Sequence, residues 1–188
     1  QIAIIGSTIG NLLAVTLAVW ASRMTAPSET AYRFAKAFLI VVSSIPFLVW
    51  GVLYATAVGF GDPFAGALAM FMFSLAIQAK LLSETVDAID IGPLEAGRAA
   101  GARHTQVIQY AAFPQVRPNY VAYALYIFEL NIRASVVIGF VGAGGIGRLL
   151  IERRTFFQWE QVMAIVLVIF VAVLLVDWVW FWAWWVLV

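Results

Sequence analysis

The sequence contains no cysteine and only one histidine, His104. The first absence excludes disulfide bonds, thiolate metal sites and cysteine nucleophiles, and one histidine cannot form a metal cluster alone, so no metal site is expected. Charged residues are also scarce, at 11%, and the 11 Lys and Arg nearly balance the 10 Asp and Glu. Without a basic surface the chain offers no reason to expect nucleic acid as a partner.

Apolar residues are abundant instead, at 64% of the 188 residues. A globular domain of this length could not bury so much apolar surface in its own core, so lipid must cover the rest. Crossing about 30 Å of hydrocarbon takes about 20 residues of helix. We therefore expect an all-α membrane protein with about five transmembrane helices, over residues 2–21, 31–58, 64–82, 116–138 and 162–186. Because Gln1 already lies in an apolar run, we also expect one further helix upstream.

Local signals refine these spans. Ser28 is placed to cap the second helix, and Pro46 removes a backbone donor inside it, which predicts a kink. Five tryptophans after Asp177 predict an interfacial belt, with Asp177 a structural residue near the interface.

Charge gathers in the segment of residues 83–105, which is predicted to be solvated and to hold a short helix over Leu94–Ala102 with His104 as a solvated neighbour. If this segment and the loop of residues 22–31 share one side of the membrane, that side carries more positive charge. It holds Arg23, Arg33, Lys36, Lys80, Arg98 and Arg103, against Arg148, Arg153 and Arg154 on the other side. The excess of Lys and Arg predicts that the segment faces the cytoplasm.

The motif within this segment is Glu95-Ala-Gly-Arg-Ala-Ala-Gly101, followed after a spacer by Phe113-Pro114. It resembles the EAA loop of permeases from bacterial ATP-binding-cassette importers. That pattern reads Glu-Ala-Ala, three residues, Gly, nine residues, an aliphatic residue, any residue, and Leu-Pro. Gly97, Ala111 and Phe113 depart from it here. An Ala-rich loop between two spans could look similar by chance, but the match at full spacing favours the motif.

The resemblance implies a type I ABC-importer permease bundle forming one domain over residues 1–188, in the bacterial cytoplasmic membrane. The coupling helix that docks on the ATPase would comprise Glu95, Ala96, Gly97, Arg98, Ala99, Ala100 and Gly101. Small residues allow close approach to a partner, and Gly101 would end the helix. The implied partners are a second copy of the chain, two nucleotide-binding ATPase subunits that bind ATP and Mg, and an extracytoplasmic substrate-binding protein. No cofactor or enzymatic activity is implied for this chain itself.

Residues 124–134 and 141–147 narrow the resemblance to the phosphonate, phosphite and phosphate branch of these permeases. The glycine-rich part alone is shared with methionine-type permeases, so a permease for methionine or another organic solute stays an alternative. The sequence does not distinguish phosphate, phosphite and phosphonate.

Polar residues in the fourth span are candidates for a translocation path: Arg117, Glu129, Asn131 and Arg133. Such residues at membrane depth face a bundle interior or a water-filled path. Glu129 and Arg133 lie four residues apart and can pair on one helix face. Two interpretations stay open, an ion pair that fixes packing, and an Arg133 fork that presents two donors to a passing oxyanion.

Gly142, Gly144, Gly145 and Gly147 allow the backbone to turn within the bundle, near a gate or simply for packing. They also satisfy a dinucleotide-binding pattern, which we reject because no strand–helix alternation surrounds it. Two other classes of protein are alternatives. An ion-coupled transporter would use Glu129, Arg133 and Asp177 as a relay, and a membrane-embedded enzyme would need clustered His or paired carboxylates.

Overall fold

The computed structural model describes residues 2–187, with side chains except at positions 180, 181 and 183–187. The elements in chain order are α1 (Ile2–Ala21), α2 (Glu29–Ser44), α3 (Phe47–Val58), α4 (Pro63–Asp87), α5 (Gly92–Ala99), α6 (His104–Val107), a π-helical turn η1 (Ile108–Ala112), α7 (Phe113–Ile138), a 3₁₀ turn η2 (Gly139–Val141), α8 (Ile146–Thr155) and α9 (Trp159–Leu187). The described part of the chain contains helices and no strands, which confirms the predicted all-α class.

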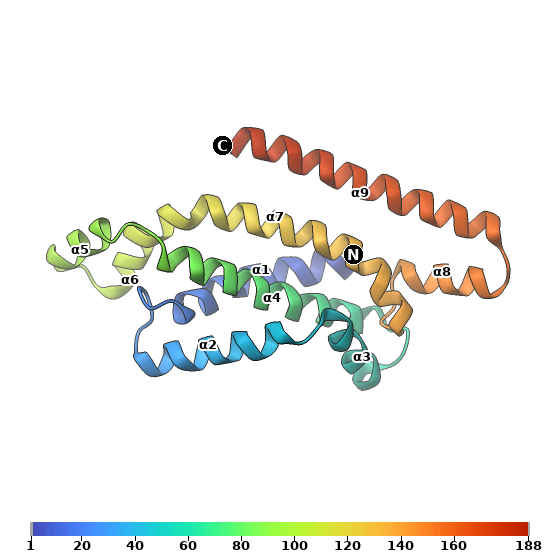
Figure 1. Cartoon of the computed structure of the whole chain (residues 1–188), viewed down its shortest axis with the longest axis horizontal. Helices are drawn as coiled ribbons and strands as arrows, with labels where there is room; N and C mark the ends of the chain where they lie inside the picture. The colour runs from blue at the N-terminus through green and yellow to red at the C-terminus, as the bar shows by residue number, and fades with distance from the viewer. Residues whose placement is uncertain (1, 188) are drawn as a thin grey trace.

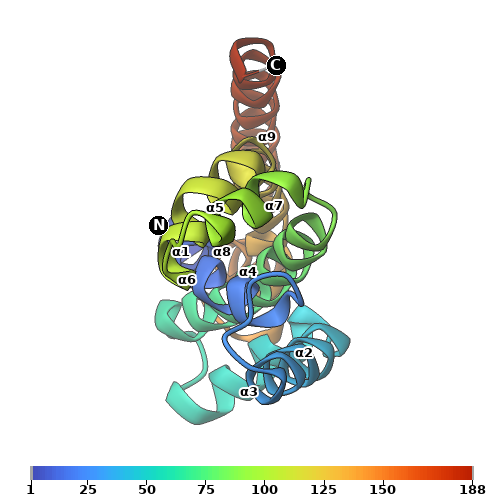
Figure 2. The same ribbon diagram turned by 90° about the vertical axis from the view of Figure 1, so that its left-hand side faces the viewer.

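The centre of the molecule is a group of long helices, α1, α4 and α7, that run side by side along its longest axis (Figure 1). α2 and α3 lie on one side of this group, and α9 stands away from it on the other side (Figure 2). α1 and α4 form the most intimate pair because α1 presents small residues to α4. An added Cβ would lie 2.7 Å from the Ala67 carbonyl oxygen at Gly6 and 2.8 Å from that of Phe71 at Gly10. This Gly-x-x-x-Gly face lets the two backbones approach closely.

The second predicted span is two helices rather than one kinked helix. α2 and α3 meet at an angle of 88° across the break at Ile45 and Pro46. Pro46 is extended, with φ −57° and ψ 142°, and its carbonyl accepts a 2.9 Å hydrogen bond from the Val49 amide, which starts a new helix. A proline within a helix removes one backbone bond and crowds the preceding turn, and here the chain turns a corner at that point.

Four helical stretches are long and apolar enough to cross a membrane, and the bent pair α2–α3 makes a fifth if it is one span. This agrees with the prediction of about five. α4 continues to Asp87, five residues past its predicted end, and Ser28 caps α2 as expected, its hydroxyl accepting from the Ala31 amide at 3.2 Å.

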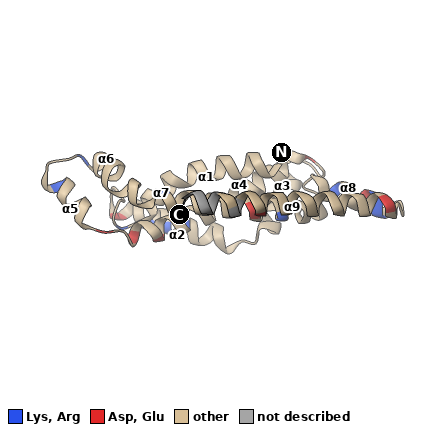
Figure 3. Ribbon diagram, turned by 90° about the horizontal axis from the view of Figure 1, so that it is seen from above, with Lys and Arg blue, Asp and Glu red and all other residues tan. Residues whose placement is uncertain are grey.

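Charged residues gather towards the two ends of the bundle (Figure 3). One end carries residues 22–28 and 88–104, and the other carries residues 59–62 and 142–158. The predicted belt lies in α9, where Trp178 and Trp182 are exposed and 6.2 Å apart between ring centroids. The side chains of Trp180, Trp184 and Trp185 fall outside the described residues.

Candidate functional site

The predicted coupling helix is α5, a short helix that projects from the end of the bundle (Figure 1). Its apolar anchor is Leu94, which is 1% exposed and packs in a small cluster with Val107 and Ala112. The other motif side chains are exposed apart from the half-buried Gly97: Glu95, Ala96, Arg98, Ala99 and Ala100, with Gly101 next to them. α5 is therefore fixed along one edge and free over the rest of its surface.

Gly101 ends α5 as the motif predicts. Its φ of +78° lies in the left-handed region, and its amide donates to the Arg98 carbonyl at 3.0 Å. The next amide, of Ala102, donates to the Gly97 carbonyl at 3.1 Å. This pair of bonds is the Schellman arrangement, which satisfies the last carbonyls of a helix and favours glycine at the left-handed position.

Hydrogen bonds tie the segment around α5 to its neighbours at both ends. The Gln115 side chain of α7 accepts a hydrogen bond from the Asp90 amide at 3.1 Å and donates one to the Asp90 carbonyl at 3.3 Å. Arg98 donates to the carbonyl of Met24 at 3.3 Å, and the His104 ring nitrogen Nε2 lies 2.8 Å from the Thr25 carbonyl oxygen. His104 is exposed but is not only a solvated loop residue, because it joins the α5 segment to residues 22–28.

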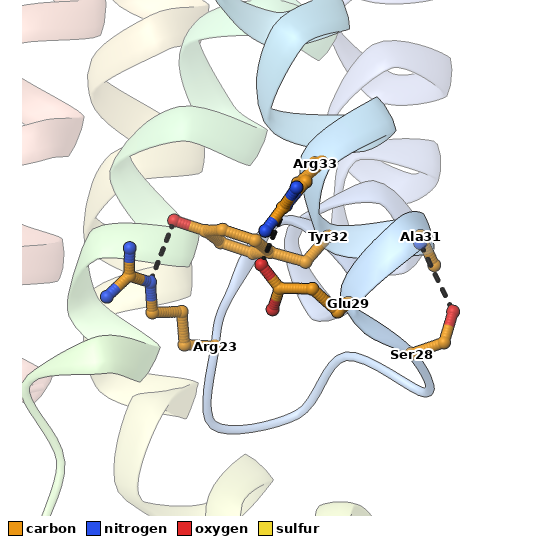
Figure 4. A network of polar contacts seen from close by, with 6 residues as sticks. All are labelled: Arg23, Ser28, Glu29, Ala31, Tyr32 and Arg33. Atoms are coloured by element: carbon orange, nitrogen blue, oxygen red, sulfur yellow. Dashed lines mark hydrogen bonds and ion pairs between the residues drawn. The ribbon is translucent and has the colours of Figure 1, made fainter.

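The loop of residues 22–28 is itself held to the end of α4. Asp87 Oδ1 accepts from the Ser22 hydroxyl at 2.6 Å and from the Arg23 amide at 2.9 Å. Arg23 also donates from Nε to the Tyr32 hydroxyl at 3.2 Å (Figure 4). That hydrogen bond raises the pKa of the Arg23 guanidinium. The loop of residues 22–31 and the segment of residues 83–105 thus share one end, which is the condition on which the count of Lys and Arg depends.

The predicted pair in the fourth span is present and has a third member. Arg133 Nη2 lies 2.5 Å from Glu129 Oε1, one turn earlier on α7. The same nitrogen donates to both carboxylate oxygens of Asp177, at 3.0 and 3.2 Å. Asp177 belongs to α9, so this contact joins two spans. Sequence reasoning placed Asp177 near an interface and missed the contact, because nothing in a single sequence indicates which side of α9 faces α7.

The other two path candidates lie elsewhere. Asn131 is fully buried, and its amide nitrogen lies 2.6 Å from both the Ser7 and Ser74 hydroxyls, so it joins α7 to α1 and α4. Arg117 is exposed and lies 16 residues from Arg133 along α7, about 24 Å at 1.5 Å per residue. Of the four residues, the structure brings together only Glu129 and Arg133.

An open groove of about 630 Å³ lies beside the Arg133 cluster. Its lining is mostly apolar and includes Ile2, Phe128, Ile132, Ser135, Ile146 and Val176. Phe128 and Ile132 are the neighbours of Glu129 and Arg133 in the chain, and Val176 is the neighbour of Asp177. The hollow thus lies near the three charged residues, although none of them is among the residues that line it.

The glycine-rich segment forms a tight turn between η2 and α8. Gly142, Gly144 and Gly145 have φ of +81°, +72° and +81°. At Gly147 an added Cβ would collide with the Val136 carbonyl oxygen of α7. Arg148 fastens the turn to the α3–α4 connection by donating to the Gly61 carbonyl at 3.0 Å. Positive φ at Gly142, Gly144 and Gly145 and close packing at Gly147 thus favour glycine at these positions.

A family model described as the binding-protein-dependent transport system inner membrane component matches residues 10–183. The chain belongs to this family. It is a multi-pass membrane protein with the architecture of a type I importer permease.

Several curated relatives are named as permease proteins for phosphite, phosphate or phosphonate. The phosphite transport system permease protein PtxC of Stutzerimonas stutzeri is 40% identical over 174 residues, covering 93% of this chain and 63% of the relative. The phosphate-import permease protein PhnE of Mycolicibacterium smegmatis is 36% identical, covering 94% of this chain and 33% of that protein. The chain thus spans less than two thirds of the length of either relative.

Solved structures agree on the fold. A chain of the MetNI methionine ABC transporter in an inward-facing conformation superposes with a TM-score of 0.79 at 20% identity, covering 100% of this chain and 91% of that chain. At such low identity this likeness describes the fold alone.

Proposed function

We propose that this chain is the membrane-spanning permease of an ATP-driven importer for phosphite, phosphate or phosphonate. Residues 1–188 form one permease domain, which works as a pair of copies in the bacterial inner membrane. Two ATPase subunits bind ATP and Mg, and an extracytoplasmic protein delivers the oxyanion. The substrate class is supported by relatives named for phosphite and phosphate transport at 33–40% identity.

The observation that carries the proposal is the exposure of α5. Its motif residues lie on a helix whose buried apolar anchor is Leu94, at the end of the bundle richer in Lys and Arg. Small exposed side chains at Ala96, Ala99 and Ala100 leave room for a cleft on an ATPase subunit to close around the helix. Excess positive charge supports a cytoplasmic position for this end.

Movement of α5 can be transmitted directly to the proposed translocation path. A helical run from His104 to Val141 extends without interruption from the α5 segment through η1 to Arg133. Gln115 fixes the start of that run to the loop before α5. Closure of the ATPase pair would therefore displace α7 as well as α5, and alternating access follows if α7 moves relative to α9.

Arg133 is the residue proposed to meet the oxyanion, because its planar fork can bind two oxygens at once. Glu129 orients it, Asn131 holds α7 to the bundle, and Arg117 lies nearer the cytoplasmic end. The glycine turn would form part of the gate on the outer side of the path. It comprises Gly142, Gly144, Gly145 and Gly147. A permease for methionine or another organic solute is the alternative, supported only by the shared fold of the methionine transporter.

Two measurements on the full-length protein test this proposal. Purification from bacterial membranes is expected to recover an ATPase subunit with the chain, and uptake assays are expected to show ATP-driven import of phosphite, phosphate or a phosphonate. Recovery without any ATPase would contradict the importer. Import of methionine but not of any phosphorus oxyanion would support the alternative.

A further inference from the structure

Arg133 contacts two carboxylates, one on its own helix and one on a different helix. Glu129 sits one turn away on α7 and is 14% exposed, so it accompanies Arg133 through any movement of that helix. Asp177 is 40% exposed and approaches from α9. With both carboxylates ionised the cluster carries one negative charge more than Arg133 can balance.

α9 is loosely attached to the rest of the molecule. It packs against α7 and α8, and no residue in its apolar window from Trp159 to Val179 is buried. Among the side chains that the structure describes, the bonds between Arg133 and Asp177 are the hydrogen bonds that join α9 to α7. Asp177 can therefore leave Arg133 by a shift of α9 without disturbing the core of α1, α4 and α7.

We propose that Asp177 is a resident substitute for the transported oxyanion. Both of its carboxylate oxygens lie within hydrogen-bond distance of Arg133 Nη2, so Asp177 holds a donor that an oxygen of a phosphorus oxyanion would otherwise take. While Asp177 is in place and both carboxylates are ionised, the extra negative charge repels other anions from Arg133. An oxyanion can bind Arg133 only after α9 has moved Asp177 away from it. In the resting state the path therefore does not bind anions. The nature of the anion rests on the proposed function.

The cysteine-free sequence allows a direct test. Val137 lies one turn beyond Arg133 on α7 and is 41% exposed, so Val137→Cys places beside the cluster the only thiol within residues 1–188. Any cysteine outside these residues is first replaced by serine. The reaction rates of this thiol with an anionic and a neutral methanethiosulfonate are compared in the full-length transporter. Adding Asp177→Asn is expected to raise the anionic-to-neutral ratio about threefold, because one nearby negative charge is removed.

Protection by inorganic phosphate distinguishes binding of an anion in place of Asp177 from a general effect of charge on thiol labelling. Phosphate is expected to slow labelling in the Asp177→Asn background, where the Asp177 carboxylate no longer contacts Arg133, and not in the parent. Glu129→Gln removes the same charge but leaves the Asp177 carboxylate on Arg133 Nη2, so it is expected to show no protection. Asp177→Glu, which keeps a carboxylate, is expected to behave as the parent.

Adding Arg133→Lys to Asp177→Asn keeps the positive charge without the planar fork, and protection by phosphate is expected to disappear. Equal protection in Glu129→Gln, or none in Asp177→Asn, would overturn the proposal. The labelling result does not depend on uptake. A transporter that imports no phosphorus oxyanion, yet shows this pattern, would refute the proposed substrate class and leave the role of Asp177 standing.

Discussion

Gly101 and Gly97 are two glycines of one motif with different physical reasons for being glycine. Gly101 has a φ of +78° and open space around the position of a Cβ, so only its backbone conformation excludes other residues. Gly97 has an ordinary helical backbone, and an added Cβ would lie 3.4 Å from Val107 Cγ2, a normal contact. The two positions therefore form a matched pair for testing the α5 cap.

Gly101→Val is expected to destabilise the end of α5 by about 1–3 kcal/mol, because a β-branched residue is strained in the left-handed region. Loss of the cap should reduce ATP-driven uptake while the thermal unfolding midpoint in detergent changes little, since α5 lies outside the bundle. Gly97→Ala is the control and should retain uptake. Equal uptake in both variants would show that the Schellman cap does not position the coupling surface.

Asn131 and Asp177 show which residue roles a sequence leaves open. Asn131 was recognised as a polar group at membrane depth and Asp177 as a structural residue near the interface, and the pairing of Glu129 with Arg133 followed from their spacing. Partners on other helices did not follow. Asn131 points to Ser7 and Ser74, which precede it by 124 and 57 residues, and Asp177 follows Arg133 by 44. Only the helix rotations, fixed by packing across the whole bundle, determine these contacts.

Among whole helices, the contact between α1 and α4 is the one most sensitive to side-chain size. Gly10→Leu is expected to force these helices apart, because the first added atom already lies 2.7 Å from Ser74 Cβ and 2.8 Å from the Phe71 carbonyl oxygen. Overpacking of this kind costs about 1–3 kcal/mol, which should lower the thermal unfolding midpoint in detergent. Leu13→Ala, at a position on α1 that is 51% exposed, is the control. An unchanged midpoint in Gly10→Leu would mean that α1 and α4 are not held by this face.

The positions of the long helices could be predicted from the sequence, but the bends between them could not. Apolar runs of sufficient length identified all the spans, since length and hydropathy decide whether a helix can cross a bilayer. The bend at Pro46 was underestimated because proline specifies a missing hydrogen bond and not the angle that follows. Packing decides that angle: Gly51 of α3 lies against Ile138, where an added Cβ would come within 2.9 Å of its side chain. The Gly6–Gly10 face was readable as a small-residue repeat and was overlooked.

The whole molecule has two polar ends, and the proposed function requires a particular one to face the cytoplasm. α5 lies at one end with residues 22–28, and the C-terminal part of α8 lies at the other (Figure 3). Ala99 and Thr155 are exposed residues at these opposite ends, on α5 and α8. Each can be replaced by cysteine, and each variant would then carry one thiol within residues 1–188.

A membrane-impermeant thiol reagent is expected to label Thr155→Cys in intact cells and Ala99→Cys only in inside-out vesicles. The physical reason is the excess of Lys and Arg around α5, which favours retention of that end on the cytoplasmic side during insertion. Addition of a permeant thiol reagent to intact cells controls for reactivity, since it should label both variants. Labelling of Ala99→Cys from outside would leave α5 on the wrong side for an ATPase, and the assignment of Glu95–Gly101 as the coupling surface would then have to be abandoned, whatever the substrate.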